Sequence, residues 1–375
     1  MAEPMTINLT AHQARLLRMR SQQLSTPRPE QAPEEVLRQI FAVQAQELPA
    51  SYLSLRARSG GFTADQVEHE RQFGSEICWR WSLRGTLHLI TVEDARWLIP
   101  LFSTDLVASD RLRLTQLGYT EKTAQKGMEV IRRAIEQHGE LTRVEIAQFL
   151  KGHNLPFEGQ ATVHILFRAV CEGAICAGVD RVKKPTYTLF EKRYGALEPR
   201  PRVEALTELA LRYLAAYAPA RPEDFAAWSG VKISEARLLW QSLTDQMLSV
   251  EVGGTPNWIL SSQATWLESL ENQPLVLRLL PRFDTYLLGY ANRDNLIDPT
   301  FNKKVFKGGG TISAVVLLDG QVIGVWKTTP KGKGLELAVE WFENQPDRLV
   351  PAIETEAADI GRFLTRPVTV KIQQP

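Results

Sequence analysis

Hydrophobic and polar positions alternate with two different periods along this chain. Apolar residues recur every three to four positions over residues 10–23 and again after Pro33, which predicts amphipathic helices. Over residues 77–91 they alternate with polar residues on both sides of Arg84 and Gly85, which predicts a β-hairpin. Helices followed by a two-stranded hairpin form the element order of a winged helix.

The same order recurs twice. A helix over 123–138 precedes a second helix in which Thr142 and Glu145 form a capping box. A third helix and two short strands follow, up to about residue 190. A further set of three helices and two strands then runs from about 203 to 260. The sequence therefore predicts an internal repeat of roughly 75 to 80 residues.

Beyond Pro274 the pattern changes to strands over 275–290 and 311–328, with a hairpin turn at Asp319 and Gly320. Helices are expected over 335–342 and 349–363. We therefore predict an α+β fold, with tandem winged-helix (helix-turn-helix plus β-hairpin) repeats and a C-terminal β-rich module. The expected domains are 1–120, 121–198, 199–272 and 273–375.

Composition narrows the class of protein. No stretch approaches twenty uninterrupted apolar residues, and the N-terminus lacks the apolar core of a signal peptide, so we expect a cytoplasmic, nucleoid-associated protein. The net charge is only +1, but six lysines and one acid lie between residues 303 and 333. This segment suits either a one-sided DNA-binding surface or a solvated lysine-rich hairpin.

The usual catalytic and cofactor signatures are missing. There is no P-loop, no GxGxxG, no GxSxG and no HExxH sequence. The three cysteines form no CxxC pair, and the six histidines have no metal-ligand spacing. We therefore expect no cofactor and no metal.

The most unusual local sequence surrounds Gln44 and Gln46. On a helix these two side chains would diverge, but in an extended or turn conformation they would point the same way. Pro49 favours the end of a helix near here. Two converging amides offer the donors and acceptors that hold a water molecule in place. The alternative is that both are solvated polar residues at a helix end.

Three segments together resemble the bacterial winged-helix DNA glycosylases of the azinomycin-resistance (AlkZ/YcaQ) family. They are FAVQAQELPASYLSLRAR, WSLRGTLHLIT and LLPRFDTYLLGYANR. The resemblance implies three tandem winged helices around a channel for duplex DNA, with a Gln-x-Gln motif facing the lesion. Here that motif is Gln44-Ala45-Gln46, so the resemblance implies that these glutamines are catalytic.

The resemblance also ranks further site residues. Asp284 and Tyr290 are possible supporting residues, and Glu47 is taken as a surface acid. DNA-facing candidates are Arg84, Thr86 and His88, expected on one strand face, together with Arg293, Lys303, Lys304 and Lys307.

The implied function is a monofunctional, metal-independent DNA glycosylase. It would hydrolyse the N-glycosidic bond of N7-alkylated purines, bulky or crosslinking adducts included, as a monomer on alkylated double-stranded DNA. Two alternatives stay open at this point. One is a winged-helix transcription regulator, and the other is a resistance protein that sequesters adducts without hydrolysis.

Overall fold

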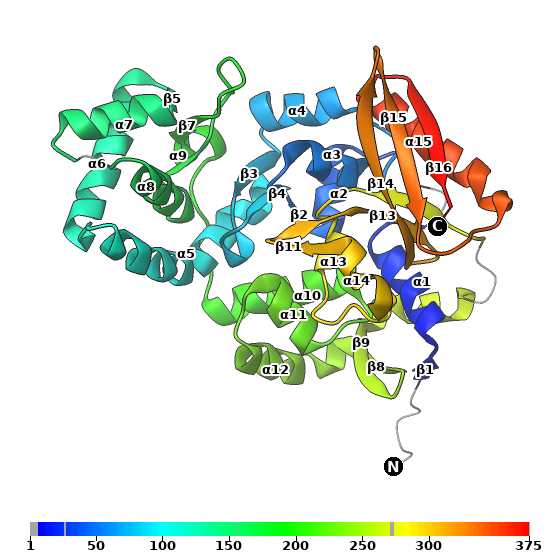
Figure 1. Cartoon of the computed structure of the whole chain (residues 1–375). Coiled ribbons are helices and arrows are strands. Elements are labelled where there is room, and N and C mark those ends of the chain that lie inside the picture. The colour runs from blue at the N-terminus through cyan, green and yellow to red at the C-terminus, as the bar shows by residue number, and fades with distance from the viewer. Residues whose placement is uncertain (1–6, 26–27, 156, 271–273, 375) are drawn as a thin grey trace. The chain divides into compact units, whose positions relative to one another are not determined.

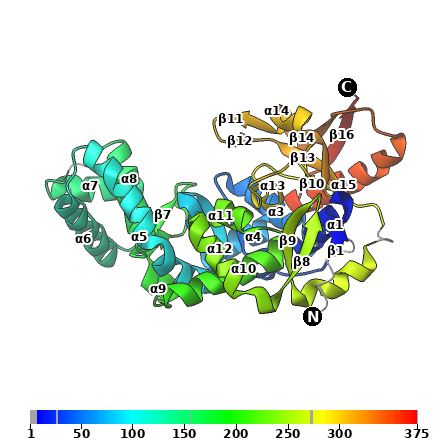
Figure 2. The same cartoon turned by 90° about the horizontal axis from the view of Figure 1, so that it is seen from below.

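The computed structural model describes residues 7–25, 28–155, 157–270 and 274–374. The chain divides into two compact units. The first unit combines Met1–Val67 with Thr207–Pro375, and the second unit is Glu68–Leu206. Figures 1 and 2 draw the chain from two directions. The four domains predicted from sequence are a finer division that stays a prediction, and the boundary at 272/273 lies outside the described residues.

A five-stranded sheet forms the C-terminal part of the first unit, in the order β10-β13-β14-β15-β16. Its strands pair antiparallel except for β15 and β16, which run parallel. Helix α15 packs against the sheet (Figure 1), where its Ile353 and Ile360 share a buried core with Leu279 and Val339. The bounds are Leu277–Leu280 (β10), Ala314–Leu318 (β13), Gln321–Lys331 (β14), Gly334–Trp341 (β15), Val350–Leu364 (α15) and Val368–Gln373 (β16).

The hairpin predicted at Asp319 and Gly320 is confirmed. Leu318 pairs with Gln321, so only two residues connect β13 to β14. Both have positive φ angles, 45° at Asp319 and 78° at Gly320. A tight two-residue hairpin turn of this hand requires such angles, which glycine adopts without strain.

The predicted helix over 335–342 is wrong, because this segment is strand β15. Leu335, Leu337, Val339 and Trp341 are buried, and the residues between them are more exposed. Burial with a period of two belongs to a strand. Leucine and glutamate favour helices, but pairing with β14 and with the distant β16 overrides that preference.

The strand pattern predicted over 275–290 holds only for β10. The chain then turns at Pro281 and forms the short helix α13, Thr285–Leu288. Asp284 caps this helix, since its carboxylate accepts a hydrogen bond of 2.9 Å from the Tyr286 backbone N–H. Capping of this kind ends an apolar run that would otherwise continue as a strand.

Helices and two small sheets complete the first unit. The predicted helix over 10–23 is present as α1, where Thr10 and Gln13 form a capping box. Strand β1 pairs parallel with β8, which continues into β9. The bounds are Ile7–Leu9 (β1), Ala11–Ser21 (α1), Pro33–Ile40 (α2), Ala42–Gln44 (β2), Leu48–Arg56 (α3), Pro222–Ser229 (α11), Ile233–Ser242 (α12), Met247–Val252 (β8), Thr255–Leu260 (β9), Asn302–Val305 (α14), Phe306–Gly308 (β11) and Thr311–Ile312 (β12). Helices α4 (Ala64–Phe73) and α10 (Arg202–Tyr217) cross the boundary between the units.

The second unit contains the first predicted hairpin and the second predicted repeat. The hairpin is confirmed as β3 and β4, which pair antiparallel. The capping box of Thr142 and Glu145 is also present, at the start of α7. Helices α6, α7 and α8 bury a core that includes Ile131, Ile146 and Ile165. The bounds are Ile77–Trp81 (β3), Leu87–Thr91 (β4), Val92–Gln116 (α5), Glu121–His138 (α6), Leu141–Thr142 (β5), Arg143–Gly152 (α7), Gln160–Cys171 (α8), Ile175–Ala177 (β6), Thr186–Leu189 (β7) and Phe190–Tyr194 (α9).

The described parts of the chain include no helix that is both long and apolar enough to cross a membrane.

Candidate active site

The segment with the two glutamines is a strand up to Gln44 and bends at Gln46. Helix α2 ends at Ile40, strand β2 ends at Gln44, and Gln46 lies in the bend before α3. Burial alternates along it, because Ala45 is fully buried while Gln44 is half-buried and Gln46 is exposed. This alternation places both glutamine side chains on the less buried side of the chain.

Helix α2 ends just before Phe41, and Pro49 lies in the first turn of α3. The two glutamines therefore lie between two helices. Phe41 adopts a φ of +72°, outside the helical region. Among residues 7–25, 28–155, 157–270 and 274–374, the Gln46 amide has no hydrogen-bond partner. An exposed amide with its donors and acceptor unsatisfied is available to a substrate or to water.

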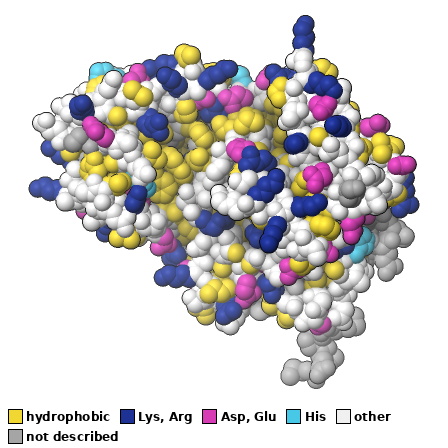
Figure 3. All heavy atoms as spheres, in the orientation of Figure 1, with side chains coloured by type: hydrophobic (Ala, Val, Ile, Leu, Met, Phe, Trp, Pro, Cys, Tyr) yellow, Lys and Arg dark blue, Asp and Glu magenta, His cyan; other side chains and the backbone are white. Residues whose placement is uncertain are grey.

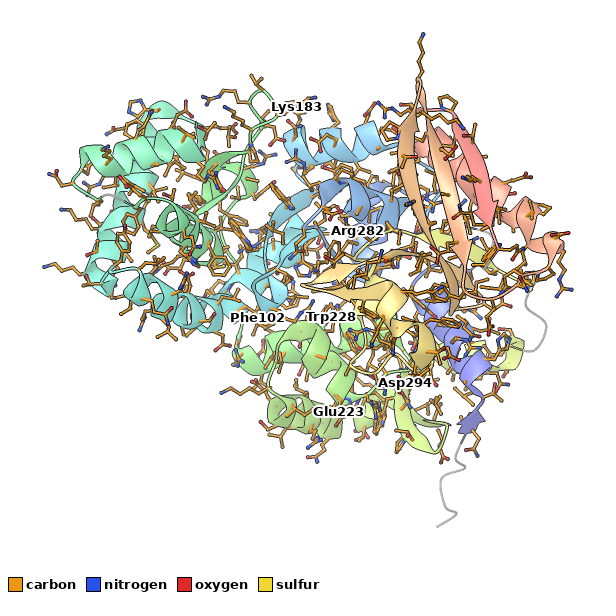
Figure 4. The ribbon with its side chains drawn as sticks, in the orientation of Figure 1. Phe102, Lys183, Glu223, Trp228, Arg282 and Asp294 are labelled. Atoms are coloured by element: carbon orange, nitrogen blue, oxygen red, sulfur yellow. The ribbon has the colours of Figure 1, made fainter. Side chains whose placement is uncertain are left out.

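Glu47 is held by an arginine that the sequence analysis did not single out. Its carboxylate lies 2.8 Å from Arg282 Nη1, and both side chains are about two-fifths exposed. Arg282 Nε also donates to the Ile312 carbonyl oxygen at 3.2 Å. Figure 4 labels Arg282. Glu47 is therefore a partly exposed acid, as expected, but one that ties the glutamine segment to β12. The signal was available, because Arg282 lies within the LLPRFD segment that carries the family resemblance.

Arg282 also lines a hollow of about 390 Å³ beside the β11–β12 hairpin and strands β13, β14 and β15. Lys307, Lys327 and Glu340 line it as well, so three of its four charged side chains are basic. A basic hollow that begins at the partner of Glu47 suits the phosphates of a nucleic acid.

The three candidate lysines all lie on the surface of the first unit. Lys303 and Lys304 belong to α14, and Lys307 belongs to β11. Lys304 Nζ is 3.3 Å from Glu340. The glycine run that follows forms the turn of the β11–β12 hairpin, with φ angles of +83°, +56° and +75° at Gly308, Gly309 and Gly310.

Asp284 lies in the interior, where it does not reach a surface. Its carboxylate accepts two hydrogen bonds of 2.9 Å from Arg58 and one of 2.7 Å from Ser54. Burial alone would raise the pKa of Asp284, but the charge of Arg58 and the hydrogen bonds outweigh burial and hold the pKa below its usual value. Ser54 lies on α3 and Arg58 lies two residues after its end, so Asp284 fixes the helix that begins beside the glutamines.

Tyr290 and Arg293 are engaged within the protein. Tyr290 is buried, its hydroxyl donates to the Tyr217 carbonyl oxygen at 2.9 Å, and the Arg18 guanidinium lies 4.1 Å from its ring centroid. Arg293 is half-buried, donates to the Leu287 carbonyl oxygen at 2.6 Å and lies over the Phe306 ring. Both therefore shape the loop after α13.

Arg84, Thr86 and His88 do not share a strand face. Arg84 occupies a tight turn (Leu83–Gly85) with a φ of +56°, and Thr86 precedes β4. His88 is buried, and burial, with a smaller contribution from Arg84, lowers its pKa to about 3. The two-residue spacing placed Arg84 on the strand with Thr86 and His88, but Arg84 and Gly85 belong to the turn of the predicted hairpin. Of the three, Arg84 is the exposed residue.

In the described part of the chain, no group of three or more histidine, cysteine, aspartate or glutamate side chains is placed to hold a metal ion.

Comparison with known proteins identifies the family. A family model described as DNA glycosylase AlkZ-like matches residues 37–363. An interstrand DNA cross-link repair glycosylase from Streptomyces sahachiroi is 29% identical over 361 residues, which cover 91% of this chain and 93% of the relative. The solved structure of the Streptomyces sahachiroi DNA glycosylase AlkZ superposes with a TM-score of 0.84 at 26% identity, covering 98% of this chain and 100% of that chain. The family resemblance inferred from sequence is thus confirmed, and the chain belongs to the AlkZ-like family of DNA glycosylases.

Proposed function

We propose that this protein hydrolyses the N-glycosidic bond of N7-alkylated purines in duplex DNA, with water positioned by Gln44 and Gln46. The observation that carries the proposal is the exposed Gln46 amide, which has no partner among the described residues and lies two residues after Gln44 at the end of β2. The relative named for interstrand cross-link repair supports extending the substrates to bulky and crosslinking adducts.

The proposed chemistry fits neutral amides. An N7-alkylated guanine is cationic, so its glycosidic bond is labile and the base departs without an acid. The enzyme must place water against C1′ and stabilise an oxocarbenium-like transition state, and positioning of this kind supplies much of a rate enhancement. Gln46 orients the water and Gln44 supports it or the sugar. Because an amide is a poor general base, normal nucleosides are spared.

The products follow from the same chemistry. Water is the nucleophile, so no lysine forms a Schiff base and the strand is left intact with an abasic site. The enzyme is therefore monofunctional, and the step that we propose uses no metal ion. Asp284 and Tyr290 support the site from the interior without touching the substrate.

The order of elements supports the winged-helix interpretation. Helix α6, strand β5, helices α7 and α8 and strands β6 and β7 follow one another, and β5, β7 and β6 form one small sheet. Helices α10, α11 and α12 and strands β8 and β9 repeat that order, and Ala220 forms a single bridge to Trp258 of β9. A helix–strand–helix–helix–hairpin unit is the architecture of winged-helix DNA binding.

DNA affinity is assigned to the exposed basic residues. We propose that Lys303, Lys304, Lys307 and Arg84 contact phosphates, which give affinity and position without sequence choice. We assign Arg293 and His88 to the support of their own elements, since both are engaged within the protein.

The test is release of 7-methylguanine from methylated duplex DNA by the wild type and by Gln46→Ala. We expect the variant to lose at least about 100-fold in rate, the usual cost of removing one preorganised polar group from an active site. DNA affinity and thermal midpoint should be retained. Gln148→Ala, at an exposed glutamine of α7, is the matched control and should keep full activity.

A wild type that releases no 7-methylguanine is tested again on a nitrogen-mustard crosslink. Unhooking there would confine the substrates to bulky adducts. A second negative result would overturn the enzymatic proposal in favour of a DNA-binding protein. Binding of adducts without turnover would identify a sequestering protein.

A further inference from the structure

The second unit contains a pocket of about 170 Å³ between β3, β4, α8 and the β6–β7 hairpin. Its walls include Trp79, Trp81 and Tyr187, together with aliphatic side chains of α8 such as Val163 and Leu166. Figure 3 shows apolar side chains gathered on the surface between α8 and β3. The pocket is therefore an opening in the surface with aromatic walls, and the proposed base excision makes no use of it.

The charged groups of this pocket are all basic. Arg80 and Arg143 line it, and no carboxylate of a described residue does. Arg80 is buried, with Nε donating to the Trp81 carbonyl oxygen and Nη2 to the Val170 carbonyl oxygen. Within the described residues its Nη1 is buried without any hydrogen-bond partner. A buried guanidinium is normally paired with an acid, so Arg80 leaves an uncompensated positive charge near the pocket, although its unused Nη1 is itself enclosed by protein and cannot reach a ligand.

We propose that this pocket binds one unstacked pyrimidine nucleotide of DNA. The base lies against the aromatic side chains, as bases do in proteins that bind single strands. Arg143, which is exposed at the start of α7, contacts the phosphate of that nucleotide. The aromatic walls favour a flat ring, and the arginines favour a negatively charged group attached to it. A nucleotide combines the two.

Size and polarity favour a pyrimidine over a purine. A cavity of roughly 150 Å³ takes a single benzene ring, so the volume of this pocket, about 170 Å³, matches one six-membered ring better than a fused pair. Among the residues that line the pocket, Arg143 and Trp81 carry an exposed guanidinium and an indole N–H, which can only donate hydrogen bonds. Thymine offers two carbonyl oxygens to such donors, and we therefore expect thymidine to bind best.

This inference rests on the DNA binding that the proposed function requires and not on base excision. The test measures the affinity of the full chain for three unmodified duplexes by fluorescence anisotropy at one salt concentration. The duplexes are identical except for a single bulged thymidine, a single bulged deoxyadenosine or no bulge. We expect the thymidine bulge to bind about tenfold more tightly than the paired duplex, within the range of one stacked base, and the deoxyadenosine bulge to gain little.

Two variants locate the effect. Val163→Trp fills the pocket from a partly exposed position on α8 and should abolish the preference for the bulge while leaving affinity for the paired duplex unchanged. Val144→Trp is the matched control, at an exposed valine of α7 that does not line the pocket. Arg143→Gln should reduce the preference several-fold, and Arg133→Gln, at an exposed arginine of α6, should not.

The possible results separate cleanly. Equal affinity for all three duplexes overturns the inference, and so does a thymidine preference that survives Val163→Trp or a failure to bind any duplex. Tighter binding of free indole or salicylate than of the bulged nucleotide, measured by competition, would assign the pocket to a small aromatic molecule and also overturn it. Loss of 7-methylguanine release on Gln46→Ala is independent of all these outcomes, so each proposal can fail without the other.

Discussion

The two ends of helix α3 lie in regions that differ in how far their polar side chains are buried and hydrogen-bonded. At its C-terminal end Arg56 is fully buried, as is Arg58 two residues further on, and their guanidinium groups lie 3.0 and 2.9 Å from Glu356 and Asp284. Before its N-terminal end, Gln46 is exposed and without a partner among the described residues. Helix α3 thus connects two buried arginines that are paired with acids to an amide that has no partner among the described residues.

The difference indicates how a reactive position is held still. A side chain that is free to bind water cannot also be fixed by hydrogen bonds of its own, so its backbone must be fixed from elsewhere. The buried contacts of Arg58, Asp284, Ser54 and Thr285 supply that rigidity. Catalysis by positioning a water molecule requires that the residues around the catalytic side chain be held rigidly.

The largest loss of stability is expected from removing the buried carboxylate of Asp284. Asp284→Ala leaves the fully buried Arg58 guanidinium without its acid and removes the cap of α13. Loss of one partner of a buried pair costs about 3–5 kcal/mol of unfolding free energy. Urea denaturation of the wild type and the variant measures this cost.

Asp245→Ala is the control for that measurement. Asp245 is exposed and has no partner in the described part of the chain, so its removal should change stability by no more than about 0.5 kcal/mol. If Asp284→Ala costs as little as Asp245→Ala, the contrast between the two ends of α3 is mistaken.

Local pattern predicted much of the fold, and nonlocal pairing explains what it missed. Helix α1, the β3–β4 hairpin and the turn at Asp319 follow from sequence because their signals are contiguous. Strand β15 was predicted as a helix because its parallel partner β16 comes after α15 in the chain. No window of sequence around residues 335–342 contains that partner.

The candidate site could likewise be predicted only where its signals are local in the sequence. The sequence left Gln44 and Gln46 either in an extended segment or at a helix end, and the structure shows strand at Gln44 and a bend at Gln46. The pairing of Glu47 with Arg282 could not be derived, because it joins positions 235 residues apart. The burial of His88 was missed for a related reason, since an alternating strand pattern does not say which face is covered.

The stability that Asp284 contributes should also depend on pH. The pKa of Asp284 is held below its usual value, so the unfolded chain takes up the proton first as pH falls. The stability contributed by the Asp284 charge is therefore complete at neutral pH and is lost below about pH 4. The unfolding free energies of wild type and Asp284→Asn should differ by a constant amount from about pH 7 to pH 5, and the difference should shrink below about pH 4.

Other groups titrate in acid, and the comparison of two proteins removes them. Burial lowers the pKa of His88 to about 3, so His88 also costs stability as pH falls below its unfolded value of about 6.5. That loss is common to wild type and Asp284→Asn and cancels in their difference. A difference that grows as pH falls would contradict the assignment of an ionised Asp284 to the folded state.

The smallest effect on stability is expected at the glutamine end. Glu47 and Arg282 are each about two-fifths exposed, so a double-mutant cycle with Glu47→Gln and Arg282→Gln should give a coupling of about 0.2–1 kcal/mol. Base release should respond more, because the pair fixes the bend that contains Gln46. We expect Glu47→Gln to lower kcat for 7-methylguanine release several-fold with little change in KM, as befits a positioning residue.

A second pair of exposed charges, Glu223 and Arg237, is the matched control, with Arg237 Nη2 2.9 Å from the Glu223 carboxylate. Its double-mutant cycle should give a similar coupling without altering kcat. Equal loss of activity in both cycles would show that surface charge, and not the position of Gln46, governs the rate.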